Sequence, residues 1–484
     1  MMYHLLQVQT KISILLPWDT GEYFSNSDLV LGPIYFVMLL LVAFFTRNIF
    51  VKDPEIKKYF FPALLAKMFG SVMVGLVYAF YYKGGDTSNY FYDSSVFFQT
   101  FIESPSAFFK ILFNTNNYFE PAVYDFAIQF RFIHDPQSFM VSKITGILSL
   151  LSFRTYIGVS LFYAFFSFSG VWALFTTFCK IYPNLKRQFA IAVLFIPSVC
   201  FWGSGILKDA ITFSCVGWMT FCIYNLFFAR RRQFLSIFML VFTAWLCASI
   251  KGYIVLSILP PFLIWIFLNF RERIKSRFFR SISTPLILGG SALGAFLMIK
   301  VLGSSFEKYS LNNFQETAEV YQTSNSVNVS GDQASVYDIG QKNFDGSVGS
   351  FAKILPLAIN VTLFRPYLWD VRNPIMVLSA FESTFFLLFT LRILFRTGLG
   401  GFYRSIIRNS FVFFCMTYSM LFAFAVGFTA ANFGALVRYK IPCIPFFLAA
   451  LYVMDYETKQ QKARQAKFKS SRLQVQPPES QPSV

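Results

Sequence analysis

Long apolar runs, separated by short charged segments, limit what this sequence can fold into more than any other feature. Hydrophobic residues occupy 55% of its 484 positions, and a helix of about 20 apolar residues crosses the ~30 Å hydrocarbon core of a membrane. We predict an all-α, polytopic transmembrane bundle of about eleven spans, since only helices and closed barrels satisfy their backbone groups in lipid. The predicted spans are 29–48, 60–82, 155–179, 188–203, 209–229, 233–250, 252–270, 281–302, 376–396, 409–428 and 437–455.

The composition excludes a soluble globular domain and argues against a nucleic-acid partner. Charged residues make up only 14% of the chain, whereas about a quarter is usual in soluble proteins. The formal net charge is +18, but the basic residues flank apolar runs, where they suit anionic lipid headgroups. The predicted partners therefore include membrane lipids and no nucleic acid.

Six basic clusters indicate the orientation. They hold roughly 25 of the 42 Lys and Arg residues, and basic loops stay in the cytoplasm by the positive-inside rule. The clusters are Arg47 to Lys58, Lys180 to Arg187, Arg230 to Arg232, Arg271 to Arg280, Arg392 to Arg408 and Lys459 to Arg472. The N-terminus is therefore predicted outside, the basic tail is predicted in the cytoplasm, and function is expected on the outer face.

The predicted organisation is an N-terminal outer segment (1–28), a polytopic domain (29–455) with outer loops 83–140 and 303–375, and a tail (456–484). The aromatic residues of the first loop predict short helices in the membrane interface. The polar stretch 303–350 is expected to be partly disordered, and 351–364 is expected to be re-entrant or interfacial. The basic, then Gln- and Pro-rich tail is also expected to be disordered.

Nothing in the sequence points to a resident cofactor. Seven cysteines lie in or beside apolar runs, none at metal-binding spacing, and there are only two histidines. No phosphate-binding glycine loop of a nucleotide site is present. We predict no defined cofactor and leave a divalent metal open. A sugar donor, if one is used, is expected to be carried on a lipid.

The first candidate site is the sequence GGDTSNYFYD at 84–93, directly after a span. Transfer to a hydroxyl group needs a carboxylate to accept its proton, and a loop at the membrane edge can hold one in a partly dry pocket. We predict Asp86 as the catalytic base, Asp93 as a second catalytic carboxylate or metal ligand, and Tyr90 in substrate binding. The structural alternative is a turn in which Asp86 caps the next helix.

The second candidate is WGSGILKD at 202–209. Lys208 is predicted to bind a phosphate as a point charge, and Trp202 to contact substrate. Asp209 is expected to neutralise Lys208 when no ligand is bound. The structural alternative is a Lys–Asp pair that caps the following helix.

The third candidate is RPYLWDVRN at 365–373. Arg365 and Arg372 suit phosphate contacts, and Trp369 suits stacking against a sugar; the alternative is an interfacial anchor with an Arg–Asp pair. Glu382, inside the next span, is expected to pair with Arg365 or Lys251. Lys251 is itself a predicted phosphate-binding residue or a snorkelling anchor.

The fourth candidate is NFGALVRYKIPCIP at 432–445. Arg438 stands at the entrance of the last span, and the prolines that follow distort that span, so the guanidinium could face a lipid phosphate. Asn432 is a predicted substrate-binding residue. The alternative is that Arg438 and Lys440 snorkel to headgroups, and Lys440 is the weaker functional candidate.

These motifs resemble polytopic bacterial polysaccharide-assembly proteins, in particular the GT-C glycosyltransferases that use polyprenyl-phosphate sugars. The segment from Arg438 to Phe446 is similar to their final-span pattern, and Gly85-Asp86 with Tyr90 resembles their first outer loop, where an Asp acts as base. The segments 197–209 and 364–366 also resemble motifs of this group. In departure from the family pattern, Asp86 is followed by Thr87 rather than by a second acid, and an extra span precedes the loop.

The resemblance implies a bacterial inner-membrane enzyme of cell-surface polysaccharide biosynthesis. It would transfer a sugar from a polyprenyl-(pyro)phosphate donor to a glycan or lipid acceptor on the extracytoplasmic face. An O-antigen or exopolysaccharide polymerase or ligase is the alternative in the same class, and a lipid-linked glycan flippase or transporter is the alternative in another. The sugar, the acceptor and the oligomeric state are not defined by the sequence.

Overall fold

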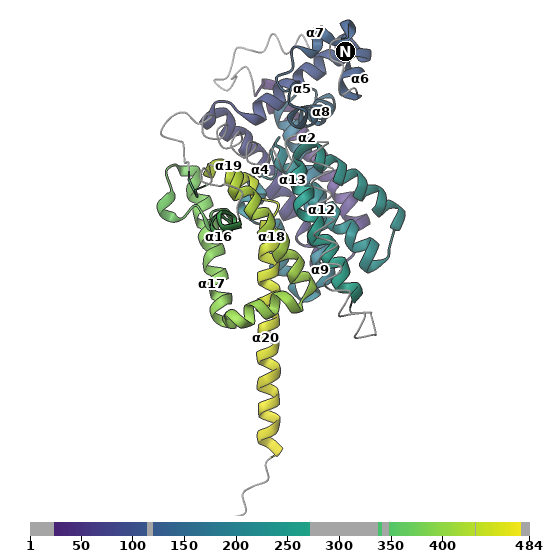
Figure 1. Ribbon diagram of the computed structural model, residues 1–484. Helices are drawn as coiled ribbons and strands as arrows, with labels where there is room; N and C mark the ends of the chain where they lie inside the picture. Colours follow the sequence, from purple (N-terminus) through teal and green to yellow (C-terminus); the bar gives the residue numbers. More distant parts are fainter. Residues whose placement is uncertain (1–23, 114–119, 272–336, 341–347, 431, 476–484) are drawn as a thin grey trace, which may run out of the picture.

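The computed structural model describes residues 24–113, 120–271, 337–340, 348–430 and 432–475. All regular structure in these residues is helical. The helices form a bundle with a group of short helices at one end and one long helix projecting from the other (Figure 1). The all-α prediction is confirmed.

Seven helices among the described residues are long and apolar enough to cross a membrane. They are α2 (Asn26–Phe50), Pro54–Tyr82 formed by α3 (Pro54–Lys57), α4 (Phe60–Leu76) and η1 (Val77–Tyr82), α9 (Tyr156–Ile181), Lys208–Ala229 formed by α12 (Lys208–Ile223) and η4 (Tyr224–Ala229), α13 (Gln233–Arg271), α17 (Pro374–Arg408) and α18 (Ser410–Thr429). α19 (Phe433–Tyr439) and α20 (Ile444–Val475) meet at a 65° bend and together make up to eight. The chain is therefore an integral membrane protein.

The predicted span 188–203 is not a continuous helix. It divides into α10 (Lys186–Phe189), the π-helical turn η3 (Ala190–Leu194) and α11 (Pro197–Phe201). The helix breaks before Pro197, because proline has no backbone N–H to donate to the preceding turn. At its start Lys186 lies 2.6 Å from Asp53, between α2 and α4. Beyond its end Lys208 lies 3.8 Å from Asp135, at the far end of the bundle. The chain therefore runs the length of the bundle here in short pieces.

α13 reverses direction at Lys251, whose backbone angles are not helical (φ −145°, ψ 78°). Trp265, near the end of α13, stacks on Phe228, which lies just before its beginning, with ring centroids 4.4 Å apart. The two ends of α13 therefore lie side by side. This arrangement fits the two predicted spans 233–250 and 252–270.

Parts of the predicted organisation lie outside the described residues: 1–23, the span 281–302, most of 303–347 and the last part of the tail (476–484). α16 (Val348–Phe364) covers the predicted re-entrant or interfacial piece. Thr362 of α16 donates a hydrogen bond to the Ala423 carbonyl of α18 at 2.7 Å. The apolar part of α16, Ala352–Phe364, is shorter than a span and packs against α18.

The first outer loop forms four helices grouped at one end of the molecule (Figure 1). They are α5 (Asp86–Glu103), α6 (Pro105–Phe113), α7 (Pro121–Ala127) and α8 (Pro136–Leu151). Phe97 is fully buried among Phe108, Phe130 and Phe139, with ring centroids 4.5 to 5.9 Å away. The short helices agree with the prediction, and their aromatic rings form a core separate from that of the main bundle. The location of these helices in the membrane interface stays a prediction.

The basic clusters of the described residues gather at the opposite end. Arg396 Nη1 lies 2.8 Å from Asp455 of α20, and Lys186 contacts both Asp53 and Glu55. We call this the basic end and the other the Asp86 end. α20 continues through Val475 and projects from the basic end (Figure 1). The predicted disorder of the tail is therefore wrong for 456–475.

Candidate functional site

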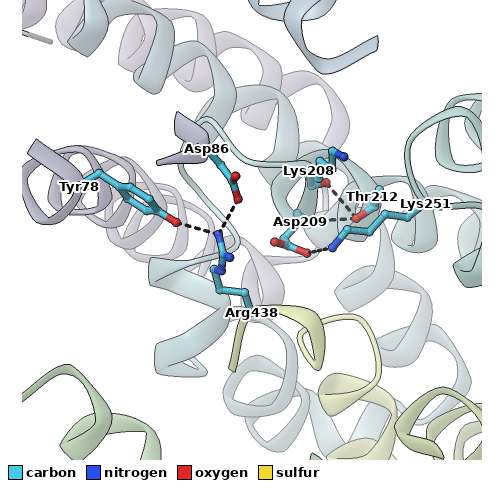
Figure 2. A network of polar contacts seen from close by, with 7 residues as sticks. All are labelled: Tyr78, Asp86, Lys208, Asp209, Thr212, Lys251 and Arg438. Carbon is cyan, nitrogen blue, oxygen red and sulfur yellow. Dashed lines mark hydrogen bonds and ion pairs between the residues drawn. The ribbon is translucent and has the colours of Figure 1, made fainter. Parts of the chain in front are cut away.

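Arg438 joins Tyr78 and Asp86 at the Asp86 end (Figure 2). Its Nη1 donates to the Tyr78 hydroxyl at 2.7 Å and to Asp86 Oδ2 at 3.1 Å. Only 14% of the Arg438 side chain is exposed, whereas half of the Asp86 side chain (50%) is exposed. No other hydrogen bond from the described residues involves this guanidinium. Its Nε and Nη2 can therefore donate to a ligand.

A glycine turn places Asp86 beside Tyr78. Gly84 (φ +147°) and Gly85 (φ +123°) have backbone angles that L side chains rarely adopt. A Cβ on Gly85 would lie 2.8 Å from Cε1 of Tyr78. Gly85 is the N-cap of α5 and Asp86 its first helical residue, where a carboxylate is favoured by the helix dipole. The structural alternative, in which Asp86 is the N-cap of the next helix, is therefore wrong.

The short helix α19 sets the position of Arg438. It begins at Asn432, whose Oδ1 accepts the Gly434 N–H at 2.6 Å as an N-cap. Asn432 is buried, so its predicted role in substrate binding is replaced by this structural one. The bend of 65° before α20 turns α19 away from the axis of the last span. The prolines at 442 and 445 explain why the helix is interrupted there.

Asp209 and Lys251 form a buried ion pair beside Arg438. Lys251 Nζ lies 2.5 Å from Asp209 Oδ1, and their side chains are 9% and 4% exposed. The Tyr439 ring lies 4.2 Å from the same ammonium group, an additional attraction for a cation. In Figure 2 the Asp209 carboxylate lies between Lys251 and Arg438. Lys251, a predicted phosphate-binding residue, is thus already neutralised by a carboxylate.

Lys208 pairs with Asp135 and not with its neighbour Asp209, contrary to the expectation from the sequence. Its Nζ lies 3.8 Å from Asp135 Oδ2, and its side chain is 21% exposed. Asp135 is also the N-cap of α8, accepting the Gln137 N–H at 3.2 Å. A contact of 3.8 Å to a carboxylate that is itself 39% exposed is weak. Lys208 therefore remains a candidate for binding an anion.

This region holds three carboxylates and three cationic side chains, and the six groups differ in how exposed they are. Side-chain exposure falls in the order Asp86 (50%), Asp135 (39%), Lys208 (21%), Arg438 (14%), Lys251 (9%) and Asp209 (4%). In both of the outer pairs the carboxylate is the more exposed partner, so water already competes for it. An anionic ligand that arrives from the surface could thus replace Asp86 and Asp135 at a small energetic cost and contact Arg438 and Lys208.

The 365–373 segment forms a separate cluster of polar and aromatic groups. Arg365 makes two hydrogen bonds of 2.8 Å to the carboxylate of Asp370. This pairing raises the pKa of Arg365. Burial alone would raise the pKa of Asp370, but the pairing with Arg365 opposes burial and holds that pKa below its usual range. Trp369 is 78% exposed and stacks on Tyr367 at 4.8 Å, and Arg372 is exposed. This geometry matches the Arg–Asp pair of the structural alternative.

Asp93 and Tyr90 do not belong to the site. Asp93 is fully buried and accepts hydrogen bonds from the Arg131 N–H (2.8 Å), the Phe132 N–H (3.3 Å) and Ser142 (2.7 Å). It links α5 to α8 and to the segment before α8, and this geometry gives no support to the prediction of a second catalytic carboxylate or metal ligand. Tyr90 is 2% exposed, with its ring 4.9 Å from Phe132, and is a core residue.

Tyr78 and Trp202 pack against each other next to Arg438. Trp202, predicted to bind substrate, is 6% exposed and lies edge-on to Tyr78 at 6.3 Å, so it supports the tyrosine that orients Arg438. Tyr78 itself was missed. It lies in the aromatic run VYAFYY at the end of a span. Apart from its position eight residues before Asp86, no sequence signal distinguishes Tyr78 from its neighbours as a partner of Arg438.

The structure gives no separate indication of a metal centre or of a family. Among the described residues, no three His, Cys, Asp or Glu side chains form a group that could hold a metal ion. No family model, curated protein or solved structure matches the chain. The resemblance to GT-C enzymes therefore stays a prediction.

Proposed function

We propose that this chain is a membrane glycosyltransferase that moves a sugar from a polyprenyl-(pyro)phosphate donor to a glycan or lipid acceptor. The observation that carries the proposal is the contact between Asp86 and Arg438. A half-exposed carboxylate meets a guanidinium at one end of a membrane bundle, and the Nε and Nη2 of this guanidinium have no hydrogen bond to the described residues. Transfer from a phosphate leaving group needs both a proton acceptor and a cation for the departing charge.

In the proposed reaction Asp86 accepts the proton of the acceptor hydroxyl as its oxygen attacks the anomeric carbon of the donor sugar. A new glycosidic bond forms, and the bond between the anomeric carbon and the phosphate oxygen breaks. The lipid phosphate leaves with the electron pair. Arg438 stabilises the negative charge of this phosphate through Nε and Nη2, and Lys208 contributes a second positive charge.

The structure ranks the predicted cations for this role. Lys251 is occupied by Asp209 at 2.5 Å and Arg365 by Asp370 at 2.8 Å, so both would have to break a short ion pair. The one ion-pair partner of Lys208 among the described residues is Asp135, at 3.8 Å. We therefore assign the phosphate to Arg438 and Lys208, and we place Arg365 and Arg372 in secondary contacts.

The proposed location is the extracytoplasmic face of a bacterial inner membrane. The described basic clusters lie at the end opposite to Asp86, and basic segments stay in the cytoplasm. This orientation would put Asp86 and Arg438 outside and α20 inside. Nucleotide-bound donors are confined to the cytoplasm, so a lipid-linked donor fits this side of the membrane better.

The test is complementation of a deletion strain, with lipid-linked intermediates measured by mass spectrometry. We expect the deletion to accumulate a polyprenyl-linked sugar and the wild-type gene to remove it. Asp86→Asn and Arg438→Ala should not remove it, whereas Asp125→Asn, at an exposed acid on α7 of the same loop, should. Removal of the intermediate by both site variants would refute the proposal. If Asp86→Asn is active while Arg438→Ala and Arg365→Ala are not, a polymerase or ligase is favoured.

A lipid-linked glycan transporter is the second candidate, because charged groups are buried inside the bundle. Lys67 in the span of α4 is 1% exposed and donates to the Gly203 carbonyl at 2.6 Å. Interrupted helices beside buried charges are typical of transporters. Movement of a labelled polyprenyl-phosphate sugar across proteoliposomes, with no glycosidic product, would favour this function over transfer.

A further inference from the structure

A second cluster of buried polar groups lies on α17, away from Asp86. Glu382 is 7% exposed and Ser383 is fully buried, although both belong to a candidate span. The sequence predicted that Glu382 would pair with Arg365 or Lys251, but it pairs with neither of them. Its two oxygens accept the backbone N–H (2.9 Å) and the hydroxyl (2.8 Å) of Ser198, at the start of α11.

Ser383 and Lys440 bind the same backbone carbonyl. The Ser383 hydroxyl donates to the Arg365 carbonyl at 3.0 Å and accepts from Lys440 Nζ at 2.9 Å. Lys440 also donates to the Arg365 carbonyl at 3.3 Å and has no exposed surface. Lys440 therefore does not snorkel to the headgroups. We call Glu382, Ser383 and Lys440 the α17 node.

Each segment that the α17 node binds contains, or continues along the chain to, a cationic residue of a candidate site. Ser198 lies in the first turn of α11, and the irregular residues after α11 lead to Lys208. Lys440 follows Arg438 by two residues, at the bend between α19 and α20. Arg365 is bound directly. None of the three segments lies within a long helix. Their backbone hydrogen bonds are local turns, such as Trp202 N–H to the Ser198 carbonyl and Ile441 N–H to the Arg438 carbonyl, which do not fix one segment relative to another.

Polar and charged groups inside a membrane are costly, and apolar packing alone could join α17 to its neighbours. A buried network in which every group has a partner instead fixes one relative position of the segments that it joins. Within the described part of the chain, the side chains of the α17 node hydrogen-bond only to Ser198, to the Arg365 carbonyl and to one another, which argues for a role in aligning these segments.

We propose that the α17 node is a set of positioning residues that holds Arg438, Lys208 and Arg365 in register for a phosphate-bearing ligand. Glu382 fixes the approach to Lys208 through α11. Ser383 and Lys440 fix Arg438 and Arg365 through one shared carbonyl. The positioning role holds whatever the ligand is, whereas the identification of the ligand as a phosphate rests on the proposed function.

The first test is amide hydrogen exchange of the full-length protein in nanodiscs. Loss of one buried hydrogen-bond partner should speed exchange about tenfold in the segment that it held. Glu382→Gln should affect 198–207 and, because the buried Lys440 loses its nearby opposite charge, also 438–443. Ser383→Ala should affect 365–370 and 438–443 but leave 198–207 unchanged. The control is Ser379→Ala, one turn earlier on α17, at a buried serine without a hydrogen bond among the described residues; it should change neither segment.

Equal acceleration across the whole bundle, or acceleration limited to α17, would overturn the positioning role. Ser383→Thr keeps the hydroxyl and should restore slow exchange at 365–370. Should this variant fold poorly because of its extra methyl group, the contrast between Glu382→Gln and Ser383→Ala still decides, since only Glu382→Gln should affect 198–207.

The second test measures affinity for a polyprenyl phosphate in the same nanodiscs. We expect Ser383→Ala to weaken binding about tenfold and Ser379→Ala to leave it unchanged, with Ser383→Thr close to wild type. Unchanged affinity in Ser383→Ala, despite faster exchange at 438–443, would refute the link to phosphate. If the wild type binds no polyprenyl phosphate, the proposed function fails, and the exchange experiment still tests the alignment.

Discussion

Arg438 Nη1 lies 3.1 Å from Asp86 Oδ2, although 352 positions separate the two residues in the sequence. The pair is asymmetric in burial, because Asp86 is 50% exposed and Arg438 only 14%. The guanidinium is also held by the Tyr78 hydroxyl at 2.7 Å. A ligand phosphate could therefore displace the carboxylate while the arginine keeps its position. Asp86, once displaced, would lie beside the bound donor and be free to accept a proton.

Asp86→Asn should reduce sugar transfer by about 10² to 10⁴-fold, the usual contribution of a general base. The amide keeps the shape of the side chain but cannot accept the acceptor's proton. Because Arg438 keeps the Tyr78 hydroxyl as an acceptor and the new amide oxygen can accept as well, the free energy of unfolding should change by only about 1–2 kcal/mol. Initial rates of donor consumption in proteoliposomes, together with thermal denaturation in detergent, measure both quantities. Asp125→Asn is the matched control, and equal rates in the two variants would contradict the assignment.

Gly85→Ala should displace Asp86 without altering any charged group. The φ of +123° disfavours every L residue, and the new Cβ would lie 2.8 Å from the Tyr78 ring. Strain of this kind costs about 1–3 kcal/mol, and relieving it would move Asp86 or Tyr78. We expect a loss of sugar transfer of at least about tenfold, measured as initial rate.

Gly84→Ala is the control for Gly85→Ala. Its φ is +147°, but a Cβ there meets nothing within 4 Å. It should therefore lower the melting temperature through backbone strain and retain more transfer activity than Gly85→Ala. If both variants lose the same activity, the contact with Tyr78 has no part in placing Asp86.

Sequence patterns predicted the membrane helices better than the interruptions between them. Runs such as 155–179 match α9 closely, since an apolar run of this length has few alternatives in lipid. The segment 188–203 is just as apolar but contains Pro197, and it forms three short helices. A proline shows where a helix must break but not the direction in which the chain continues, which depends on packing against α4 and α9.

The candidate site was predicted in part. Asp86 and Arg438 were both selected because charged residues at the ends of spans need partners, but their pairing depends on the bend before α20. Lys208 and Asp209 are adjacent in sequence and were expected to pair. On a helix, neighbouring side chains point in different directions. Lys208 therefore meets Asp135 and Asp209 meets Lys251, partners that only the tertiary fold can supply.

Asp209→Asn should destabilise the protein by about 3–5 kcal/mol, because it leaves the Lys251 ammonium buried without a counter-charge. The double variant Asp209→Asn/Lys251→Met should regain most of this loss, since an apolar side chain avoids the desolvation of the charge. Thermal denaturation of the single and double variants forms a double-mutant cycle. A double variant no more stable than Asp209→Asn would contradict a net electrostatic pair.

Lys110→Met is the matched control for that cycle. Lys110 and Glu120 form an ion pair of 2.5 Å, but their side chains are 43% and 38% exposed. Solvent screens such a pair, so its removal should change the free energy of unfolding by less than about 1 kcal/mol. The contrast between the two pairs separates the effect of burial from that of distance.

Asp93 should make the stability of the α5–α8 group depend on pH. Burial raises the pKa of Asp93 from 3.8 to about 6, against its hydrogen bonds from Ser142 and two backbone N–H groups. Between these pH values the folded state keeps a proton that the unfolded state has lost. The contribution of Asp93 to stability is therefore fully present below about pH 4 and is lost as the pH rises to about 6. The loss from this group is on the order of 3 kcal/mol.

Asp93→Asn should remove this dependence, because the amide does not titrate. Its absolute stability should be lower than wild type, since the amide nitrogen cannot accept the hydrogen bonds that both carboxylate oxygens now accept. The diagnostic quantity is thus the slope of the unfolding free energy between pH 4 and about 6, measured by denaturant titration of the protein in detergent. Asp125→Asn should keep the wild-type slope. An unchanged slope in Asp93→Asn would assign the pH dependence to another group.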